Sequence, residues 1–423
     1  MNPHDARRIL TLDILRGAAL MGIFIVHGTG LFCGWTMFSP EQRAALPFPM
    51  ANGLTHEAVT FLFTDKSRIM FAFMFGVSFF LQLKSAERRG HSFHRSFLRR
   101  LAVLLVFGLV HAHLLFGGDI LRYYVLGGLL LLLTYRWSSR GLLIIGGVLV
   151  LLVPCAADVA TELLGATASM PDWQRVAEAY RSPSLTGFIR MEHSLAMWRY
   201  EWPLLMSFAA PVAGTFLFGV WMARHQYLQQ AEQHRSRLKT LAWWGLGVGA
   251  LGQALQLAAG LFQEAGGLHV PPVLFMACIP LVYLGHQALT LFYICGMALL
   301  CVHPTWRRWL ALLAPAGRMT LTNYILQSVL GALVFYGFGL GLFGRVGPSV
   351  ALLITLGLCA LQLLYSAWWL RHFQMGPLEW LWRWMVQGSR PNFRVDSQPE
   401  HRPPGVTRRR GLVRRLTRGT ATP

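Results

Sequence analysis

The sequence predicts an all-α, polytopic helical membrane protein with about ten transmembrane helices. The chain has 423 residues, of which 54% are hydrophobic and only 13% are charged. Soluble domains carry about 25% charged residues, so the composition excludes a soluble enzyme. Several apolar runs are close to the ~20 residues with which a helix crosses a bilayer. These runs are continuously apolar rather than alternating, which excludes a membrane β-barrel.

The apolar runs define the expected spans in chain order. The spans are 14–34, 59–83, 98–117, 120–136, 141–162, 203–223, 240–262, 281–302, 318–341 and 349–370. Residues 1–388 therefore form one transmembrane domain. The tail at 389–423 carries the basic run Arg408–Arg410, and we expect it to be disordered. We also expect it to bind anionic lipids, at about 1 kcal/mol for each basic residue near the surface.

Basic residues give the chain a net charge of +20. In a soluble protein this charge would suggest nucleic-acid binding. Here the basic residues lie between apolar runs, so we expect no nucleic-acid partner. Lysine and arginine concentrate in cytoplasmic loops. If the N-terminus is cytoplasmic, only nine of the 38 lysines and arginines lie on the outer side. They are Arg43, Lys66, Arg68, Arg122, Arg175, Arg181, Arg190, Arg199 and Arg345. This bias predicts that both termini are cytoplasmic.

Three ionisable residues, Asp13, Arg16 and His27, lie within the first span or directly before it. Such groups are costly inside a membrane and mark candidate functional sites. Arg16 and His27 share one helix face and lie about 16 Å apart along the axis. Asp13 can pair with Arg16 at the i,i+3 spacing. The alternative is that Arg16 only reaches the interface and that His27 bonds a neighbouring helix.

Two further groups lie near the expected outer ends of spans. Asp65 and Arg68 can pair at the entrance of the second span, or they form only a charged helix entrance. His111 and Asp119 flank a tight turn between the third and fourth spans. His111 and His113 point to different sides of one helix, so we expect no metal site. The segments 35–58 and 163–202 should form interfacial helices or a lid.

The ninth span begins at Arg318 and carries a polar stripe of Thr320, Asn323 and Gln327. The spacing places this stripe on one helix face. Two interpretations remain open. The stripe either bonds neighbouring helices together or lines a polar cavity.

Four motifs resemble the YeiB-like bacterial membrane proteins, the family called domain of unknown function 418. They are Thr11–Gly17, Gly118–Leu121, Gly317–Ser328 and Gly376–Arg383. The resemblance extends from residue 10 to residue 388. It implies a multi-pass protein of the bacterial plasma (inner) membrane.

The chain is also distantly similar to the membrane acyltransferase group, which includes the acyltransferase-3 proteins and the heparan glucosaminide N-acetyltransferase type. Those proteins move an acyl group, usually from coenzyme A, to an acceptor across the membrane. In the acyltransferase-3 proteins a basic residue, ten further residues and a histidine in the first span carry function, and Arg16 and His27 match that spacing. The cytoplasmic R-x-x-R motif of the acyltransferase-3 proteins is not reproduced, because Arg95, Arg99 and Arg100 have a different spacing.

This similarity implies acyl transfer from cytoplasmic acyl-coenzyme A, as a co-substrate rather than a bound cofactor, to an outer hydroxyl or amine acceptor. His27 would act as general base, and Asp119 or His111 would orient the acceptor. Arg16 and the loop arginines would hold the donor phosphates. The predicted substrate-binding residues are Asp13, Asp65, Arg68, Arg95, Arg99, Arg100, Arg318, Asn323 and Gln327.

Two other functions stay open. In a small-molecule or lipid transporter or flippase, the same polar stripes would line a path. Transporters often show two related halves, and no internal repeat is evident in this sequence, which favours the enzyme. The third interpretation is a non-catalytic membrane scaffold.

Overall fold

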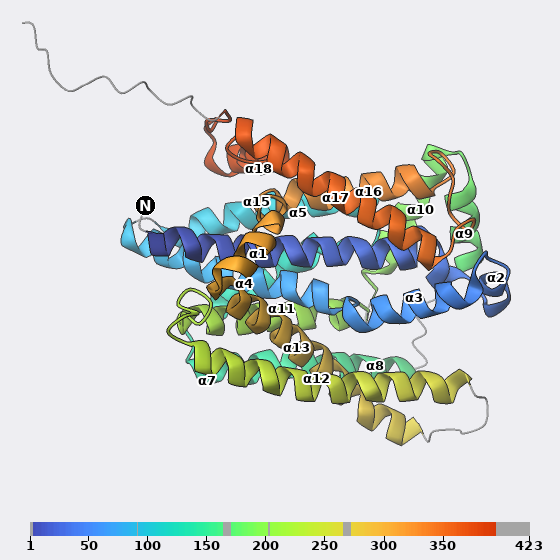
Figure 1. The fold of residues 1–423 in the computed structure, drawn as a ribbon, viewed down its shortest axis with the longest axis horizontal. Coiled ribbons are helices and arrows are strands. Elements are labelled where there is room, and N and C mark those ends of the chain that lie inside the picture. Colours follow the sequence, from blue (N-terminus) through green and yellow to red (C-terminus); the bar gives the residue numbers. More distant parts are fainter. Residues whose placement is uncertain (1–2, 91, 164–170, 202–203, 265–271, 395–423) are drawn as a thin grey trace, which may run out of the picture.

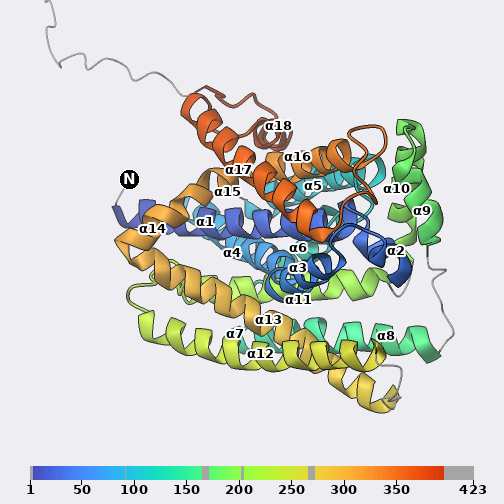
Figure 2. The same ribbon diagram turned by 45° about the vertical axis from the view of Figure 1, so that its right-hand side comes forward.

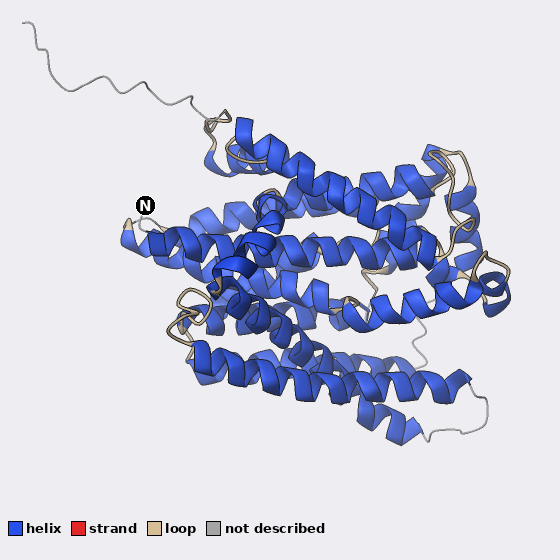
Figure 3. Ribbon diagram, viewed as in Figure 1, coloured by secondary structure: helices blue, strands red, loops and turns tan. Residues whose placement is uncertain are grey.

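The computed structural model describes residues 3–90, 92–163, 171–201, 204–264 and 272–394. Nearly all of the described chain is helical (Figure 3). Within these ranges β-type pairing is limited to an isolated antiparallel bridge between Phe373 and Arg394. The predicted all-α fold class is therefore confirmed. Most of the predicted basic tail, from residue 395 onward, lies outside the described residues.

Most of the long helices run roughly along the long axis of the molecule (Figures 1 and 2). The α-helices are α1 (Pro3–Val26), α2 (Pro40–Ala44), α3 (Pro49–Leu62), α4 (Lys66–Arg88), α5 (Phe93–Leu114), α6 (Leu121–Thr134), α7 (Ser139–Gly147), α8 (Val153–Leu163), α9 (Trp173–Arg181), α10 (Leu185–Trp198), α11 (Leu204–Arg224), α12 (Arg235–Glu264), α13 (Pro272–Val302), α14 (Pro304–Leu310), α15 (Ala314–Arg318), α16 (Thr320–Phe335), α17 (Pro348–His372) and α18 (Pro377–Gln387). A π-helix at His27–Phe32 continues α1, and another at Val148–Leu152 joins α7 to α8.

Every predicted span falls on helical structure, although the second and the fifth are each divided between two α-helices, and the polytopic membrane fold is confirmed. In the described part of the chain, seven stretches are long and apolar enough to cross a membrane: Leu10–Phe32, Pro49–Arg88, Phe93–Leu114, Ser139–Ala157, Leu205–Arg224, Ile279–Val302 and Pro348–His372. The apolar helices α6 and α16 are shorter. These seven stretches are fewer than the ten predicted spans, and α12, although it has 30 residues, is not among them.

The bundle has two distinct ends (Figure 1). The N-terminus lies at one end, which we call the N-terminal end. Helices α2, α9 and α10 lie at the opposite end, which we call the α10 end. Because α1 runs between the two ends, it connects the predicted donor side to the predicted acceptor side.

Glycines allow the central helices to pack closely. Helix α11 lies against α4, where Gly76 and Gly219 face each other. A Cβ at Gly76 would overlap the carbonyl oxygen of Phe216, and one at Gly219 would overlap that of Phe73. In a membrane, helix association depends on such close packing rather than on the hydrophobic effect. The two glycines therefore set the spacing of this central pair.

The second predicted span differs from the expectation. It is broken, because α3 ends at Leu62 and α4 begins at Lys66. Asp65 occupies the break in a left-handed conformation with φ of 61°. The Lys66 side chain is 1% exposed, and its Nζ donates to the Thr60 carbonyl oxygen (3.0 Å) and to Gln253 Oε1 of α12 (2.9 Å). Lys66 thus points into the bundle, whereas the side chains of Asp65 and Arg68 are each 32% exposed.

Candidate functional site

Three side chains, from α5, from the turn between α5 and α6 and from α16, form a hydrogen-bonded row near the α10 end. The His111 Nδ1 lies 2.8 Å from Asp119 Oδ1, and its Nε2 lies 2.9 Å from Ser328 Oγ. All three residues are buried. An ionised carboxylate can only accept hydrogen bonds. With a neutral imidazole, Nδ1–H donates to the carboxylate of Asp119, and this tautomer leaves Nε2 to accept the proton of the Ser328 hydroxyl.

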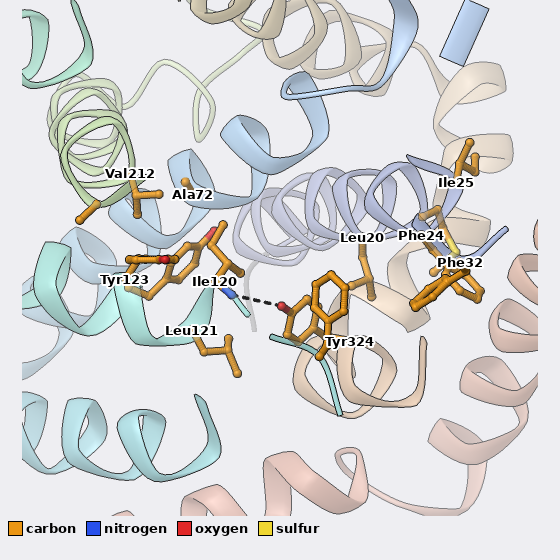
Figure 4. Packing of buried hydrophobic residues seen from close by; sticks show 14 of the residues in the cluster. Leu20, Phe24, Ile25, Phe32, Ala72, Ile120, Leu121, Tyr123, Val212 and Tyr324 are labelled. Atoms are coloured by element: carbon orange, nitrogen blue, oxygen red, sulfur yellow. Dashed lines mark hydrogen bonds between the residues drawn. The ribbon is translucent and has the colours of Figure 1, made fainter. Parts of the chain in front are cut away.

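The carboxylate of Asp119 is fixed on both oxygens. Its Oδ2 accepts from the Arg122 backbone N–H (3.1 Å), and its Oδ1 accepts from the Tyr324 hydroxyl (3.3 Å). The Tyr324 oxygen accepts in turn from the Ile120 backbone N–H at 3.3 Å (Figure 4). Tyr324 and Ser328 are i,i+4 neighbours on α16 and lie on one face. One helix face therefore positions both the carboxylate and the hydroxyl.

A second imidazole lies beside this row. The His27 ring is 4.8 Å from the Phe116 ring, whose centroid is 6.1 Å from that of His111. His27 begins the π-helix that follows α1, and π-helical turns occur often at functional sites. Among the described residues, none forms a hydrogen bond with the His27 ring. The predicted residues His27, His111 and Asp119 are thus brought together around Phe116.

Helix α10 holds the turn that carries Asp119. The Glu192 Oε2 accepts from the Gly117 backbone N–H (2.5 Å), and its Oε1 accepts from the Tyr180 hydroxyl (2.6 Å). The Arg122 guanidinium donates to the carbonyl oxygens of Gly117 (3.0 Å) and Ala196 (3.2 Å). The described part of segment 163–202 therefore packs over the turn, and its α9 and α10 are the helices predicted there.

The pH dependence of stability should report on this contact. Burial raises the pKa of Glu192 to about 7, although the bonds from Tyr180 and Gly117 oppose the shift. The folded state then holds the proton more tightly than the unfolded chain. The free energy of unfolding should fall as pH rises from about 5 to about 7, by up to ~1.4 kcal/mol per pH unit. Thermal unfolding in detergent measures this fall. A Glu192→Gln variant should lack it, and an unchanged pH slope in that variant would contradict the assignment.

The predicted pair in α1 is present, but far from His27. Arg16 Nη1 donates to Asp13 Oδ1 (2.8 Å), and Nη2 donates to Ser78 Oγ of α4 (2.7 Å). Arg16 and His27 share one helix face, but they lie three turns apart and form two separate polar sites. Arg318 is exposed, donates to the Gln374 carbonyl oxygen (3.3 Å) and lies near Asp13.

The three loop arginines lie in the first turns of α5. Arg95 and Arg99 are exposed. Arg100 donates to Gln82, and its guanidinium lies 5.2 Å from the centre of the Trp382 ring. These arginines form a basic surface toward the N-terminal end, separated from the His111 row by much of the length of α5.

Asp65 and Arg68 belong to a third group, between α4, α12 and α13. The predicted pair is present, with Arg68 Nη2 at 2.7 Å from Asp65 Oδ1. The other Asp65 oxygen lies 3.5 Å from His286 Nδ1, and His286 Nε2 lies 2.8 Å from Gln256 Oε1. Together with Lys66 and Gln253, these residues form a polar network inside the helix bundle.

The stripe on α16 faces neighbouring helices. Asn323 Nδ2 donates to Ser366 Oγ of α17 at 2.8 Å. Gln327 Nε2 donates to Gln362 Oε1 (3.2 Å) and to the Leu20 carbonyl oxygen (3.3 Å). These contacts match the interpretation of the stripe as bonding between helices. The adjacent face, with Tyr324 and Ser328, was missed, although their i,i+4 spacing in the same motif was a usable signal.

Another missed residue, Glu379, caps α16. It accepts hydrogen bonds from the backbone N–H groups of Leu321 (2.6 Å) and Thr322 (3.1 Å) and from the Thr322 hydroxyl (2.6 Å). Burial raises the pKa of Glu379. The motif Gly376–Arg383 thus holds the start of the helix that carries Ser328.

No metal centre is evident in the ranges that the structure describes, where no cluster of three or more His, Cys, Asp and Glu is placed to hold an ion. His113 turns away from His111 and lies 4.8 Å from the ring of His193.

Comparisons with known proteins place the chain in a family. A model described as "Protein of unknown function (DUF418)" matches residues 222–389. The chain is 33% identical to "Uncharacterized protein YxaH" of Bacillus subtilis (strain 168), over 89% of this chain and 93% of the relative. It is 28% identical to "Uncharacterized protein YeiB" of Escherichia coli (strain K12), over 89% and 95%. No solved structure matches. The chain therefore belongs to the YeiB-like DUF418 family of membrane proteins.

Proposed function

We propose that the protein is a membrane acyltransferase in which His111 is the general base. One observation supports this proposal above all: His111 lies between Asp119 and Ser328 at 2.8 Å and 2.9 Å. An acid that orients a histidine, which in turn accepts the proton of a hydroxyl, is the arrangement that activates a serine nucleophile.

In this proposal Ser328 carries the acyl group between two steps. Ser328 Oγ attacks the carbonyl carbon of an acyl thioester while its proton passes to His111 Nε2. The C–S bond breaks, and the thiolate leaves with that proton. The acceptor hydroxyl or amine then attacks the serine ester and gives its proton to His111, which returns a proton to Ser328. Asp119 stabilises the imidazolium in both steps. His27, across Phe116, would contact the acceptor.

The donor would be acyl-coenzyme A, held at the N-terminal end. Arg95, Arg99, Arg100 and Arg16 supply cations that suit its phosphates. The thioester carbonyl carbon must then reach Ser328, so the pantetheine arm of the donor would extend alongside α1 toward the His111 row.

Transfer from labelled acetyl-coenzyme A tests the proposal. The purified full-length protein should gain one acetyl group on Ser328, detected by mass spectrometry of intact protein and peptides. Ser328→Ala should abolish the label because the accepting hydroxyl is gone. Ser366→Ala, which removes a buried serine of α17, is the matched control and should be labelled like the unmodified chain. An unlabelled Ser328 in folded protein would refute the covalent step.

We further propose that the protein resides in the bacterial plasma membrane with both termini cytoplasmic. The distribution of lysine and arginine between alternate loops supports this orientation. In it, the basic residues of 389–423 would bind anionic lipid headgroups. A reporter that is active only in the cytoplasm should be active when it is fused after Gly388. Activity of a periplasmic reporter at that point would reverse the orientation.

A second candidate function, transport of a small molecule or lipid, is favoured by the break between α3 and α4. Broken helices with charged groups are typical of transporter sites, and Asp65, Lys66 and Arg68 lie at this break. The labelling experiment separates the two functions, because a protein that only transports leaves Ser328 unmodified.

A further inference from the structure

A cavity of about 340 Å³ lies at the α10 end, between the last residue of α9 and the loop that follows α16. Its volume is within the ~300–1,000 Å³ of typical ligand sites. It is separate from the row around His111. The residues that line it are Arg181, Gly337, Gly339, Leu340, Gly341, Phe343, Gly344 and Arg345.

The wall of this cavity is built from fixed backbone. Gly341 and Gly344 each have φ of 69°, a conformation that favours glycine. The Gly337 backbone N–H donates to the Tyr180 carbonyl oxygen (2.8 Å), and that of Gly344 donates to the Cys33 carbonyl oxygen (3.1 Å). The loop is thus attached to α9 and to the end of the first span, and the cavity does not need a ligand to take shape.

Arg181 is exposed but held in place by aromatic rings. Its guanidinium lies 5.3 Å from the centre of the Phe38 ring and 5.8 Å from that of Phe343. These two rings contact each other edge to face at 5.6 Å. Stacking on ring faces leaves the N–H edge of a guanidinium free for a ligand. The donor groups of Arg181 are therefore oriented before anything binds.

The two cavity arginines have no acidic partner in the structure as described. The salt bridges found among the described residues join other side chains. Neither guanidinium donates a hydrogen bond to a described residue. Arg181 and Arg345 therefore bring two uncompensated positive charges to one cavity.

We propose that this cavity binds the anionic group, a phosphate or a carboxylate, of a molecule at the α10 end. Planar guanidinium groups bind such groups with paired, charge-assisted hydrogen bonds. If the proposed acyl transfer is correct, the molecule is the acyl acceptor, and this part of the inference rests on the proposed function. The cavity shares its support with the reaction site, since Tyr180 contacts both Gly337 and Glu192.

Inorganic phosphate is the first probe, titrated by calorimetry into purified full-length protein in neutral detergent. Binding should weaken as ionic strength rises. Arg181→Gln and Arg345→Gln should each weaken binding about tenfold, which corresponds to ~1.4 kcal/mol. Arg175→Gln is the matched control, because Arg175 is an exposed arginine of the same helix that does not line the cavity. It should bind phosphate like the unmodified chain.

Short-chain phosphatidylglycerol and phosphatidylcholine distinguish the source of the anionic group. Tighter binding of phosphatidylglycerol than of phosphate, with the same arginine dependence, supports a lipid headgroup. Tighter binding of phosphate supports a soluble molecule. Absence of binding by both anionic probes, or equal affinity in all variants, overturns the proposal. The titrations contain no acyl donor, so a protein that binds phosphate but is not labelled at Ser328 would refute the acyl transfer and leave the anion site intact.

Discussion

Replacing His111 with glutamine should slow acyl transfer by about 10²–10⁴-fold, the usual effect of removing a positioned base. Glutamine can hydrogen-bond to Asp119 and to Ser328 but cannot take up a proton at neutral pH. The fold should survive because the polar contacts are replaced. The rate at which Ser328 acquires label from acetyl-coenzyme A measures the effect.

His27 provides the decisive comparison for this prediction. Sequence reasoning proposed His27 as the base, whereas the distances favour His111. His27→Asn should therefore leave the labelling of Ser328 nearly unchanged and slow only the release of the acyl group to an acceptor. The control is His113→Gln, on the helix of His111 but turned toward His193. If His27→Asn blocks labelling and His111→Gln does not, the two histidines exchange roles.

Gly317→Ala should lower the free energy of unfolding by about 1–3 kcal/mol, the usual effect of overpacking a core. Helix α15 crosses α1 where Gly317 lies against Gly17. A Cβ at Gly317 would overlap the carbonyl oxygen of Asp13. The two helices would have to separate, and the Asp13–Arg16 pair would move with them. The midpoint of thermal unfolding in detergent should fall accordingly.

Gly357→Ala is the matched control for this substitution. Gly357 lies in α17, and a Cβ there would have no other atom within 4 Å. Alanine favours helix more than glycine by about 1 kcal/mol, so this variant should be as stable as the unmodified chain or more so. Equal stability of the Gly317 and Gly357 variants would show that the crossing of α1 and α15 tolerates a side chain.

Much of the fold follows from local properties of the sequence. The spans could be predicted because a helix that crosses a bilayer must satisfy its backbone internally and expose apolar side chains, which leaves a continuous apolar run. The pair Asp13–Arg16 could be predicted because i,i+3 neighbours meet on a helix, and Asp65–Arg68 has the same spacing across the start of α4. The closeness of His111 and Asp119 followed from a tight turn that joins two spans. Each of these features depends on residues close together in the chain.

The tertiary structure decided which of these groups meet. Ser328 lies 217 residues from His111 along the chain, and no local pattern indicates that they touch. The same packing turned Asn323 toward α17 instead of the site, and it placed Glu192 of a predicted lid helix against the turn that carries Asp119. Arg16 and His27 share a helix face, yet they lie too far apart to act together on one atom. Helix periodicity determines the face on which a side chain lies, but only the packing of helices distant in sequence determines its partner.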